Sequence, residues 1–427
     1  MKTKTKTKNG GFKKLIVVLD GIGDRPIKKF GGRSPLEAAN CKNLNALAQS
    51  GRTGLAVVAD RIAPESDVGV FAVLGYDPTR GHVARGALEA IGFGLEFQNG
   101  WCALRGNFAT ARGTKIIDRR VGRTLQPSEA RTLAAEITKN VKLASVPAAK
   151  YVFKATVAHR CALVLRARRP LSGNVSNTDP AYMRVHGMGS AVVGYKKHAV
   201  RCAPLDNSLA AEQTAALVNE FTEKSRAALE ASAVNARRVK RGLLPANIIL
   251  LRDGQSSLPK RRPMRNWAIV ADMPLEVGIG RFLKMRVVHV PEDHHPELGG
   301  GLRERVKQTL AALHSPKNEG VYVHIKGPDL PGHWGDAAAK RRIIKKIDED
   351  FIGPLARKID WTRTRVLVTA DHSTPCELRS HSADPVPVLL VGAGIASDAS
   401  AGWSERECFE RGSIRCASSE LRRMLEK

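Results

Sequence analysis

Residues 365–372 read RVLVTADH, a short apolar run that ends in an acidic residue followed by a histidine. Two other segments repeat this pattern of an apolar run before an acid: residues 15–20 read LIVVLD, and residues 321–329 read VYVHIKGPD. Short runs rich in Val, Ile and Leu, separated by helical stretches, predict buried strands of a largely parallel sheet. The three segments therefore indicate a protein of the α/β class.

The acidic residues Asp20, Asp329 and Asp371 each come just after one of these predicted strands. In open parallel sheets, ligands bind beyond the carboxyl ends of the strands. A single acid in such a place is commonly a turn residue or a helix cap. Three of them favour a common cleft, in which we expect the carboxylates to converge.

Histidines follow two of these acids. His333 lies four residues after Asp329, His372 directly follows Asp371, and His381 lies ten residues beyond Asp371. Imidazole and carboxylate groups without cysteine suit Mn²⁺, Mg²⁺, Co²⁺ or Zn²⁺. The cluster offers more ligands than one ion needs, which predicts a pair of metal ions. Such pairs stabilise both the attacking and the leaving oxygen in phosphoryl transfer.

Ser66 lies in residues 63–75, APESDVGVFAVLG, where a polar loop leads into an apolar stretch with helical character. A serine at a helix start is most often an N-cap. The same position also suits a nucleophile that receives phosphate, because free backbone N–H groups and the helix dipole favour an anion there. The segment alone leaves both interpretations open.

The composition indicates a globular protein. The chain has 427 residues, of which 43% are hydrophobic and 26% charged, and its length suggests about two to three domains.

The seven cysteines of the chain include no Cys-x-x-Cys pair, which argues against a disulfide framework and suits a reducing compartment. The apolar run near the N-terminus is too short for a signal peptide, and no segment approaches the roughly 18 apolar residues of a membrane span. We therefore expect a cytoplasmic protein without a membrane partner.

The formal net charge of +28 has two interpretations. Basic proteins attract polyanions, so association with nucleic acid is one of them. The basic residues are nevertheless spread along the chain, apart from the KTKTKTK tail and the stretch LPKRRPMR, and no DNA- or RNA-binding motif accompanies them. We expect no specific nucleic-acid partner. The charge would then be solvated, or would attract small anionic substrates.

Segments in a fixed order cover nearly the whole chain, among them LDGIGDRP, SDVGVFAVLGYDP, DRRVGR, HIKGPDLPGHWGD and VLVTADHSTPC. Together they resemble the archaeal-type cofactor-independent (2,3-bisphosphoglycerate-independent) phosphoglycerate mutases of the alkaline phosphatase superfamily. The resemblance implies an alkaline phosphatase-like doubly wound sheet domain that binds metal and is split over residues 13–77 and 264–427. It also implies an inserted substrate-binding α/β domain at residues 78–263. The basic tail at residues 1–12 is expected to be disordered.

The resemblance implies two divalent metal ions, with Mn²⁺ as the first expectation and Mg²⁺, Co²⁺ or Zn²⁺ as alternatives. All seven ligand positions hold the expected residue types: Asp329, His333 and His381 for one ion, and Asp20, Ser66, Asp371 and His372 for the other. Ser66 would be a transient phosphoserine, which takes the phosphoryl group from one hydroxyl of glycerate and returns it to the neighbouring one. Such a nucleophile must be activated to an alkoxide, which metal coordination can supply.

Six basic residues of the middle region are the candidates for holding the phosphate and carboxylate of the substrate: Arg119, Arg120, Arg123, His159, Arg160 and Arg252. The planar fork of arginine suits both groups. In a chain with 69 Lys and Arg residues, however, any one arginine is usually only solvated. The six assignments therefore depend on the resemblance.

The implied function is the interconversion of 3-phosphoglycerate and 2-phosphoglycerate, a step of glycolysis and gluconeogenesis, with a small anionic phosphorylated substrate as partner. The sequence departs from the family at Glu65, where a small residue usually precedes the nucleophile, and at Glu276, in a segment where the family has a basic residue. The metal positions are thus kept while the substrate pocket is altered. The alternative is a related metal-dependent phosphatase or phosphotransferase that acts on another phosphorylated or phosphonylated acid, and a polyanion-binding protein is the third possibility. The sequence leaves the oligomeric state open.

Overall fold

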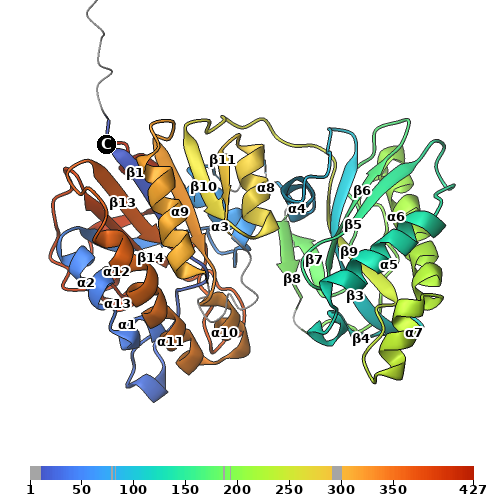
Figure 1. Cartoon of the computed structure of the whole chain (residues 1–427), viewed down its shortest axis with the longest axis horizontal. Helices are drawn as coiled ribbons and strands as arrows, with labels where there is room; N and C mark the ends of the chain where they lie inside the picture. The colour runs from blue at the N-terminus through green and yellow to red at the C-terminus, as the bar shows by residue number, and fades with distance from the viewer. Residues whose placement is uncertain (1–10, 78–79, 82, 186–187, 193, 291–300) are drawn as a thin grey trace, which may run out of the picture. The chain divides into compact units, whose positions relative to one another are not determined.

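The computed structural model describes residues 11–77, 80–81, 83–185, 188–192, 194–290 and 301–427. Of the tail expected to be disordered, residues 1–12, the first ten lie outside the described residues. The chain divides into two compact units, both drawn in Figure 1. Unit 1 consists of Met1–Arg80, Arg262–Glu276 and Leu283–Lys427, and unit 2 consists of Gly81–Arg261 and Val277–Phe282. The domain boundaries expected at residues 78 and 263 stay a prediction.

Unit 1 is built on an eight-stranded sheet with the order β11-β10-β12-β1-β13-β14-β2-β15. Its strands are β1 (Lys13–Leu19), β2 (Arg52–Val57), β10 (Trp267–Ala271), β11 (Arg286–His289), β12 (Gly320–Ile325), β13 (Thr364–Thr369), β14 (Val386–Gly392) and β15 (Ile414–Ala417). Neighbouring strands are parallel except at β14, which is antiparallel to both β13 and β2. The predicted α/β class and the largely parallel sheet are confirmed.

Helices cover both faces of this sheet. In Figure 1, α9 (Leu302–His314) lies in front of the sheet and α3 (Ser66–Val73) lies behind it. Because both faces are covered, β1, β12 and β13 are buried over nearly their whole length instead of alternating between buried and exposed residues. Further helices of unit 1 are α1 (Pro35–Ala39), α2 (Lys42–Gln49), α10 (Asp329–Trp334), α11 (Ala337–Ile347), α12 (Gly353–Ala356), α13 (Glu405–Glu410) and α14 (Ser418–Met424).

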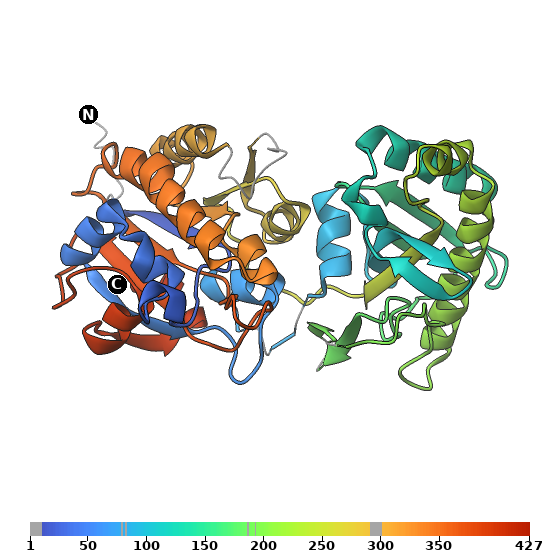
Figure 2. The same ribbon diagram turned by 90° about the horizontal axis from the view of Figure 1, so that it is seen from below.

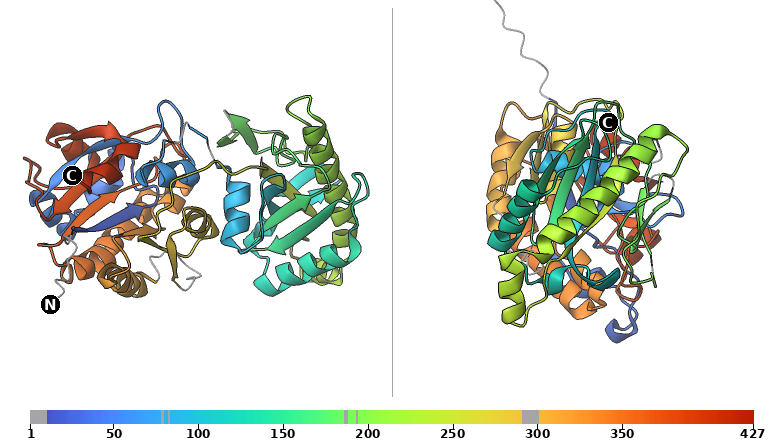
Figure 3. Two further views of the ribbon diagram at one scale, coloured as in Figure 1. Left: turned by 90° about the horizontal axis from the view of Figure 1, so that it is seen from above. Right: turned by 90° about the vertical axis from the view of Figure 1, so that its right-hand side faces the viewer.

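Unit 2 is built on a five-stranded antiparallel sheet, in which β3 pairs with three of the other strands. The strands are β3 (Cys102–Arg112), β4 (Lys115–Asp118), β5 (Lys150–Ala155), β6 (Arg160–Arg166) and β9 (Ile248–Gln255). Helices α5 (Pro127–Asn140) and α6 (Leu209–Glu230) pack around Phe108, Phe153 and Phe221 on one face, which α6 crosses in Figure 3 (right). Helix α4 (Arg85–Gly92) lies on the opposite face (Figure 2). Unit 2 also contains α7 (Ala233–Lys240), β7 (Tyr182–Val185) and β8 (Met188–Ala191).

Helix α8 (Pro274–Phe282) begins in unit 1, and its residues from Val277 onward belong to unit 2. Gly278 allows this helix to approach α4 closely, because a Cβ at that position would lie 1.9 Å from the backbone oxygen of Leu88. Within the described part of the chain, none of the helices has both the length and the apolar character that a membrane span requires.

Candidate active site

Three neighbouring strands of unit 1 carry acidic residues to the same edge of the sheet. Strand β1 lies between β12 and β13 and runs parallel to both. Asp20 follows β1, Asp329 is the first residue of α10 after β12, and Asp371 follows β13. Two groups that consist of predicted ligands alone have ligand atoms within 4.8 Å of one another: Asp329 with His333 and His381, and Asp20 with Asp329 and His372. The structure thus brings the predicted Asp and His ligands together.

The first group contains Asp329, His333 and His381. Nε2 of His333 and Nε2 of His381 lie 3.5 Å and 3.4 Å from the same atom, Oδ1 of Asp329. In His333, the other ring nitrogen, Nδ1, lies 3.1 Å from the backbone oxygen of Arg379. In His381, Nδ1 lies 2.9 Å from the backbone oxygen of Pro64. A carbonyl oxygen can only accept, so Nδ1 donates in both rings. Nε2 is therefore the nitrogen left to bind a metal ion.

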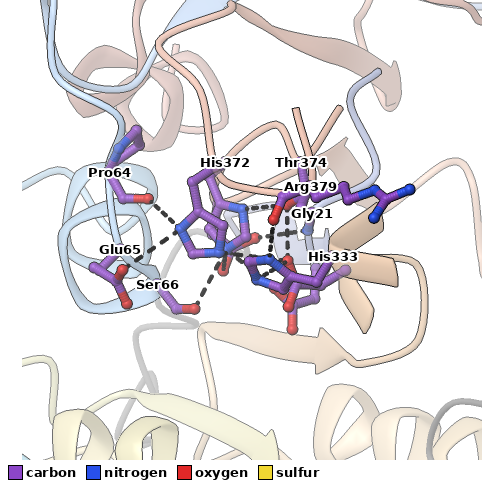
Figure 4. A network of polar contacts seen from close by, with 12 residues as sticks. Gly21, Pro64, Glu65, Ser66, His333, His372, Thr374 and Arg379 are labelled. Carbon is purple, nitrogen blue, oxygen red and sulfur yellow. Dashed lines mark hydrogen bonds and ion pairs between the residues drawn. The ribbon is translucent and has the colours of Figure 1, made fainter. Parts of the chain in front are cut away.

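The other predicted Asp and His ligands, Asp20, Asp371 and His372, also lie close together. Nε2 of His372 lies 3.3 Å from Oδ1 of Asp20 and 3.4 Å from Oδ2 of Asp371. The hydroxyl of Thr374 donates to Oδ1 of Asp329 at 2.7 Å, so at 3.1 Å it accepts from Nδ1 of His372. Nε2 of this third ring is again the nitrogen that faces the carboxylates. Figure 4 shows His333 and His372 turned into the same cluster.

The donor atoms of these groups fit a cation. Oδ1 of Asp20 and Oδ2 of Asp371 are buried and accept no hydrogen bond from any described residue, which is costly for charged oxygens. Burial and the charge of Asp20 raise the pKa of Asp371. Burial lowers the pKa of His381, but the carboxylates of Asp329 and Glu65 outweigh burial and raise this pKa to about 10. The cluster therefore attracts positive charge, and its oxygen and nitrogen donors suit a hard or borderline divalent ion.

Ser66 is the first residue of α3, and Glu65 occupies the N-cap position without a side-chain capping bond. The interpretation of Ser66 as an N-cap is therefore wrong. Its hydroxyl lies 3.4 Å from Nε2 of His372, and Figure 4 shows it pointing toward the histidines. One turn later, a Cβ on Gly69 would lie 2.0 Å from the backbone oxygen of Asp371. Glycine at that position lets the start of α3 reach the two groups of ligands.

The predicted substrate-binding residues all lie in unit 2, where five of them influence one another. Burial, followed by the charges of Arg160, Arg120, Arg252 and Arg123, lowers the pKa of His159 to about 2. The imidazole is therefore neutral at physiological pH. Its Nδ1 makes no hydrogen bond with any described residue. A cluster of guanidinium groups around a neutral polar ring suits a bound anion.

Arg119 and Arg252 are both held by Asp179, which the sequence motifs do not single out. Nε of Arg119 donates to Oδ1 of Asp179 at 2.9 Å, and its Nη2 pairs with Oδ2 of the same side chain. Arg252 donates to Oδ2 of Asp179 at 3.1 Å and to Oδ1 of Asn107 at 3.3 Å. The ring of Tyr182 lies below both guanidinium groups, 5.1 Å from that of Arg119 and 4.7 Å from that of Arg252. Asp179 thus balances part of the positive charge.

Comparison with known proteins decides the family. The family described as 2,3-bisphosphoglycerate-independent phosphoglycerate mutase matches residues 48–235, and the family described as Metalloenzyme superfamily matches residues 268–421. The chain is 40% identical to the 2,3-bisphosphoglycerate-independent phosphoglycerate mutase of Aeropyrum pernix, over 90% of this chain and 92% of that protein. It is 36% identical to 2,3-bisphosphoglycerate-independent phosphoglycerate mutase 1 of Archaeoglobus fulgidus, over 95% of each. The chain belongs to this mutase family.

Solved structures agree with this assignment, and the family that the sequence motifs indicated is confirmed. The PH0037 protein from Pyrococcus horikoshii superimposes with a TM-score of 0.79 at 25% identity, over 97% of this chain and 96% of that one. The cofactor-independent phosphoglycerate mutase from Thermoplasma acidophilum gives a TM-score of 0.63 at 29% identity, over 97% and 99%.

Three residues of this mutase-family site were not predicted from the sequence: His324, Lys326 and Thr374. The hydroxyl of Thr374 links the two groups of candidate ligands, as described above. Burial raises the pKa of Asp20, but the charge of Lys326 outweighs burial and holds this pKa well below its usual value. A signal for the first two was present, because polar residues at alternate positions of VYVHIKG share one face of an otherwise apolar strand.

Proposed function

We propose that the chain is a phosphoglycerate mutase that interconverts 3-phosphoglycerate and 2-phosphoglycerate through a phosphoserine at Ser66. Membership of the mutase family supports the reaction. One observation supports the role of Ser66: its hydroxyl lies 3.4 Å from Nε2 of His372, beside the cluster of Asp and His donors. A serine that only capped a helix would turn its oxygen to backbone N–H groups instead.

In the proposed reaction, Oγ of Ser66 forms a bond to phosphorus while the bond between phosphorus and the substrate oxygen breaks. The serine proton ends on that oxygen, which leaves glycerate beside the phosphoserine. The reverse step transfers the group to the neighbouring hydroxyl of glycerate. Ser66 is 8% exposed, and this burial limits the access of water to the phosphoserine.

We propose two divalent ions as cofactors, with Mn²⁺ as the first choice and Mg²⁺, Co²⁺ or Zn²⁺ as alternatives. The ligands would be Asp329, His333 and His381 for one ion, and Asp20, Ser66, Asp371 and His372 for the other. When bound, such ions lower the pKa of a coordinated hydroxyl and balance the charge of a phosphoryl group. Exhaustive chelation should abolish activity, and Mn²⁺ or Co²⁺ should restore it. Full activity in protein that metal analysis shows to be free of metal would exclude the two ions.

The basic residues of unit 2 are proposed to hold the phosphate and carboxylate of the substrate: Arg119, Arg120, Arg123, His159, Arg160 and Arg252. The neutral His159 would offer hydrogen bonds where the guanidinium groups offer charge. Arg119, which already pairs with Asp179, would act more through that pair than through the substrate. Replacing Arg160 by Met should therefore raise the KM for phosphoglycerate more than Arg119→Met does.

The deciding experiment compares Ser66→Ala with the wild type in an assay of 3-phosphoglycerate conversion, coupled to enolase and without added bisphosphoglycerate. Mutase turnover should fall by several orders of magnitude, as for the loss of other catalytic nucleophiles. Wild-type protein mixed briefly with labelled phosphoglycerate and quenched should carry the label on Ser66. Ser50→Ala, which changes an exposed serine, is the matched control. Retained activity in Ser66→Ala, or label on another residue, would refute the assignment.

Glu65 favours a second candidate, a phosphatase or phosphotransferase of the same superfamily. Its Oε1 lies 3.9 Å from Nδ1 of His381, so a carboxylate stands directly before the nucleophile. This negative charge disfavours retention of the glycerate carboxylate while Ser66 carries the phosphoryl group, which gives water time to release inorganic phosphate. Label on Ser66 with release of inorganic phosphate and no mutase product would assign the chain to this second candidate.

We propose the cytoplasm as the compartment. All seven cysteines are free, and six of them are buried. Free buried thiols are typical of proteins that fold in a reducing environment. The proposed partner is a small phosphorylated acid.

A further inference from the structure

His324 faces three carboxylates from within the buried part of strand β12. Its Nε2 lies 3.9 Å from Oδ2 of Asp20, 3.7 Å from Oε1 of Glu276 and 3.8 Å from Oδ2 of Asp371. These separations are too long for hydrogen bonds, and Nε2 makes none with any described residue. The other nitrogen, Nδ1, contacts the hydroxyl of Tyr322 at 2.9 Å. The ligand atoms of Asp20, His324 and Asp371 all lie within 4.8 Å of one another, as the ligands of a single cation do, and Glu276 adds a third carboxylate beside them.

The ammonium of Lys326 already sits against two of these carboxylates. Nζ lies 2.8 Å from Oδ2 of Asp20 and 2.9 Å from Oε1 of Glu276. The side chain of Glu276 is 1% exposed, so its charge would be left uncompensated without the lysine.

The lysine also determines which oxygen of Asp20 faces the proposed metal ions. Oδ2 contacts Lys326, whereas Oδ1 faces Nε2 of His372 at 3.3 Å and accepts no hydrogen bond from any described residue. An outer contact of this kind fixes the orientation of a ligand before the ion binds. Glu276, the departure from the family noted in the sequence, in turn holds Lys326.

We propose that Lys326 is a built-in cation of the metal centre: its ammonium takes the place that a third divalent ion would take among Asp20, Glu276, His324 and Asp371. Lys326 and Glu276 are then positioning residues, which keep the number of divalent ions at two and turn Oδ1 of Asp20 toward them. The inference rests on the proposed function, because it takes Asp20 as a metal ligand.

The test is to count Mn²⁺ ions per chain by plasma mass spectrometry after gel filtration, and to measure their affinity by calorimetry. Lys326→Met removes the ammonium and leaves all four ligands, so the variant should bind one more Mn²⁺ than the wild type. The double variant Lys326→Met/Glu276→Gln removes the extra carboxylate and should return to the wild-type count. Its affinity for Mn²⁺ should be weaker by roughly 10- to 100-fold, the usual effect of losing an outer-shell contact.

The matched control is Lys14→Met, which removes a lysine paired with Glu319 at the opposite end of β1. It should leave both the count and the affinity unchanged. Unchanged counts in Lys326→Met, or unchanged affinity in the double variant, would overturn the inference. If Lys326→Met does not fold, as judged by circular dichroism, the charge-balanced double variant decides alone. A wild type that binds no Mn²⁺ would instead refute the proposed metal centre, and the inference with it.

Discussion

Lys340 shows how a single buried side chain supports the candidate active site. Its ammonium is fully buried and donates to the backbone oxygens of Gly23 at 3.0 Å and Thr374 at 2.9 Å, and to Oδ2 of Asp24 at 2.9 Å. Gly23 belongs to the loop that follows β1, and Thr374 belongs to the loop that follows β13. The lysine therefore joins the two loops that carry candidate metal ligands.

Lys340→Met should lower the free energy of unfolding by roughly 3–5 kcal/mol, because it leaves Asp24 as an uncompensated buried charge. Urea denaturation followed by circular dichroism measures the loss. Lys346→Met, which breaks an exposed pair with Asp350, is the control and should cost less than about 1 kcal/mol. The double variant Asp24→Asn/Lys340→Met should lose less than the sum of its single variants. Equal losses for Lys340→Met and Lys346→Met would contradict this role.

Glu405 should make the stability of unit 1 depend on pH. Burial raises the pKa of Glu405 from 4.5 to about 7, although its carboxylate accepts hydrogen bonds from the hydroxyl of Ser34 and the backbone N–H of Asp24. The folded protein thus binds this proton more tightly than the unfolded chain. Stability from this group is therefore largest below pH 4.5, falls as the pH rises toward about 7, and changes no further above it.

Glu405→Gln keeps a polar group of the same shape and removes the ionisation. We expect the melting temperature of the variant minus that of the wild type to be larger at pH 8 than at pH 5. The reason is that only the wild type has to bury a charge at the higher pH. Thermal melts at the two pH values measure the difference. An offset that is the same at both would show that Glu405 does not titrate in this range.

At the residue scale, the sequence predicted the acidic residues that lie at strand ends. It missed residues whose role depends on a contact with a distant part of the chain. Asp20, Asp329 and Asp371 could be found because a parallel sheet brings successive strand ends to one edge. Lys326 also comes directly after a strand, β12. Its role was missed because its partner, Glu276, belongs to helix α8, which lies elsewhere in the sequence. Asp179 could not be foreseen, because the pairing that defines its role depends on how unit 2 folds.

At the scale of elements, α3 is positioned by the absence of a side chain at Gly69. Gly69→Ala would place a methyl group 2.0 Å from the backbone oxygen of Asp371, so the helix start must move. Overpacking of this kind costs about 1–3 kcal/mol. It should also lower mutase turnover, because Ser66 lies one turn before Gly69. Turnover and thermal stability are the measurements. Gly11→Ala, which meets no atom within 4 Å, is the control, and equal activity of both variants would contradict this explanation.

The direction of each strand is the part of the fold that could not be predicted from the sequence. Residues 386–392, VPVLLVG, are as apolar as the parallel strands, yet β14 runs antiparallel to its neighbours. A buried strand is apolar on both faces whichever way it runs, so its composition carries no direction. The same limit applies to unit 2, whose sheet is wholly antiparallel.

For the whole molecule, the net charge of +28 predicts a dependence of substrate capture on salt. Attraction between the basic protein and an anionic substrate is screened beyond about 10 Å at 0.1 M salt. Raising the salt concentration should therefore raise KM modestly and leave kcat nearly constant. Steady-state kinetics in increasing potassium chloride test this, with melting temperatures as the control for effects on the fold. A parallel fall in kcat, or tight sequence-selective binding of DNA or RNA at physiological salt, would contradict it.

The strand order of unit 1 also determines when each part can fold during synthesis. Strand β1 pairs with β12 and β13, which begin at Gly320 and Thr364, so β1 leaves the ribosome long before its partners exist. The five strands of the larger sheet of unit 2 all lie between Cys102 and Gln255 and can pair in the meantime. An apolar strand without partners is prone to aggregate, and chaperones cover such segments on nascent chains. Stalled nascent chains treated with protease should therefore be cleaved within residues 13–77 while residues 102–255 are already protected.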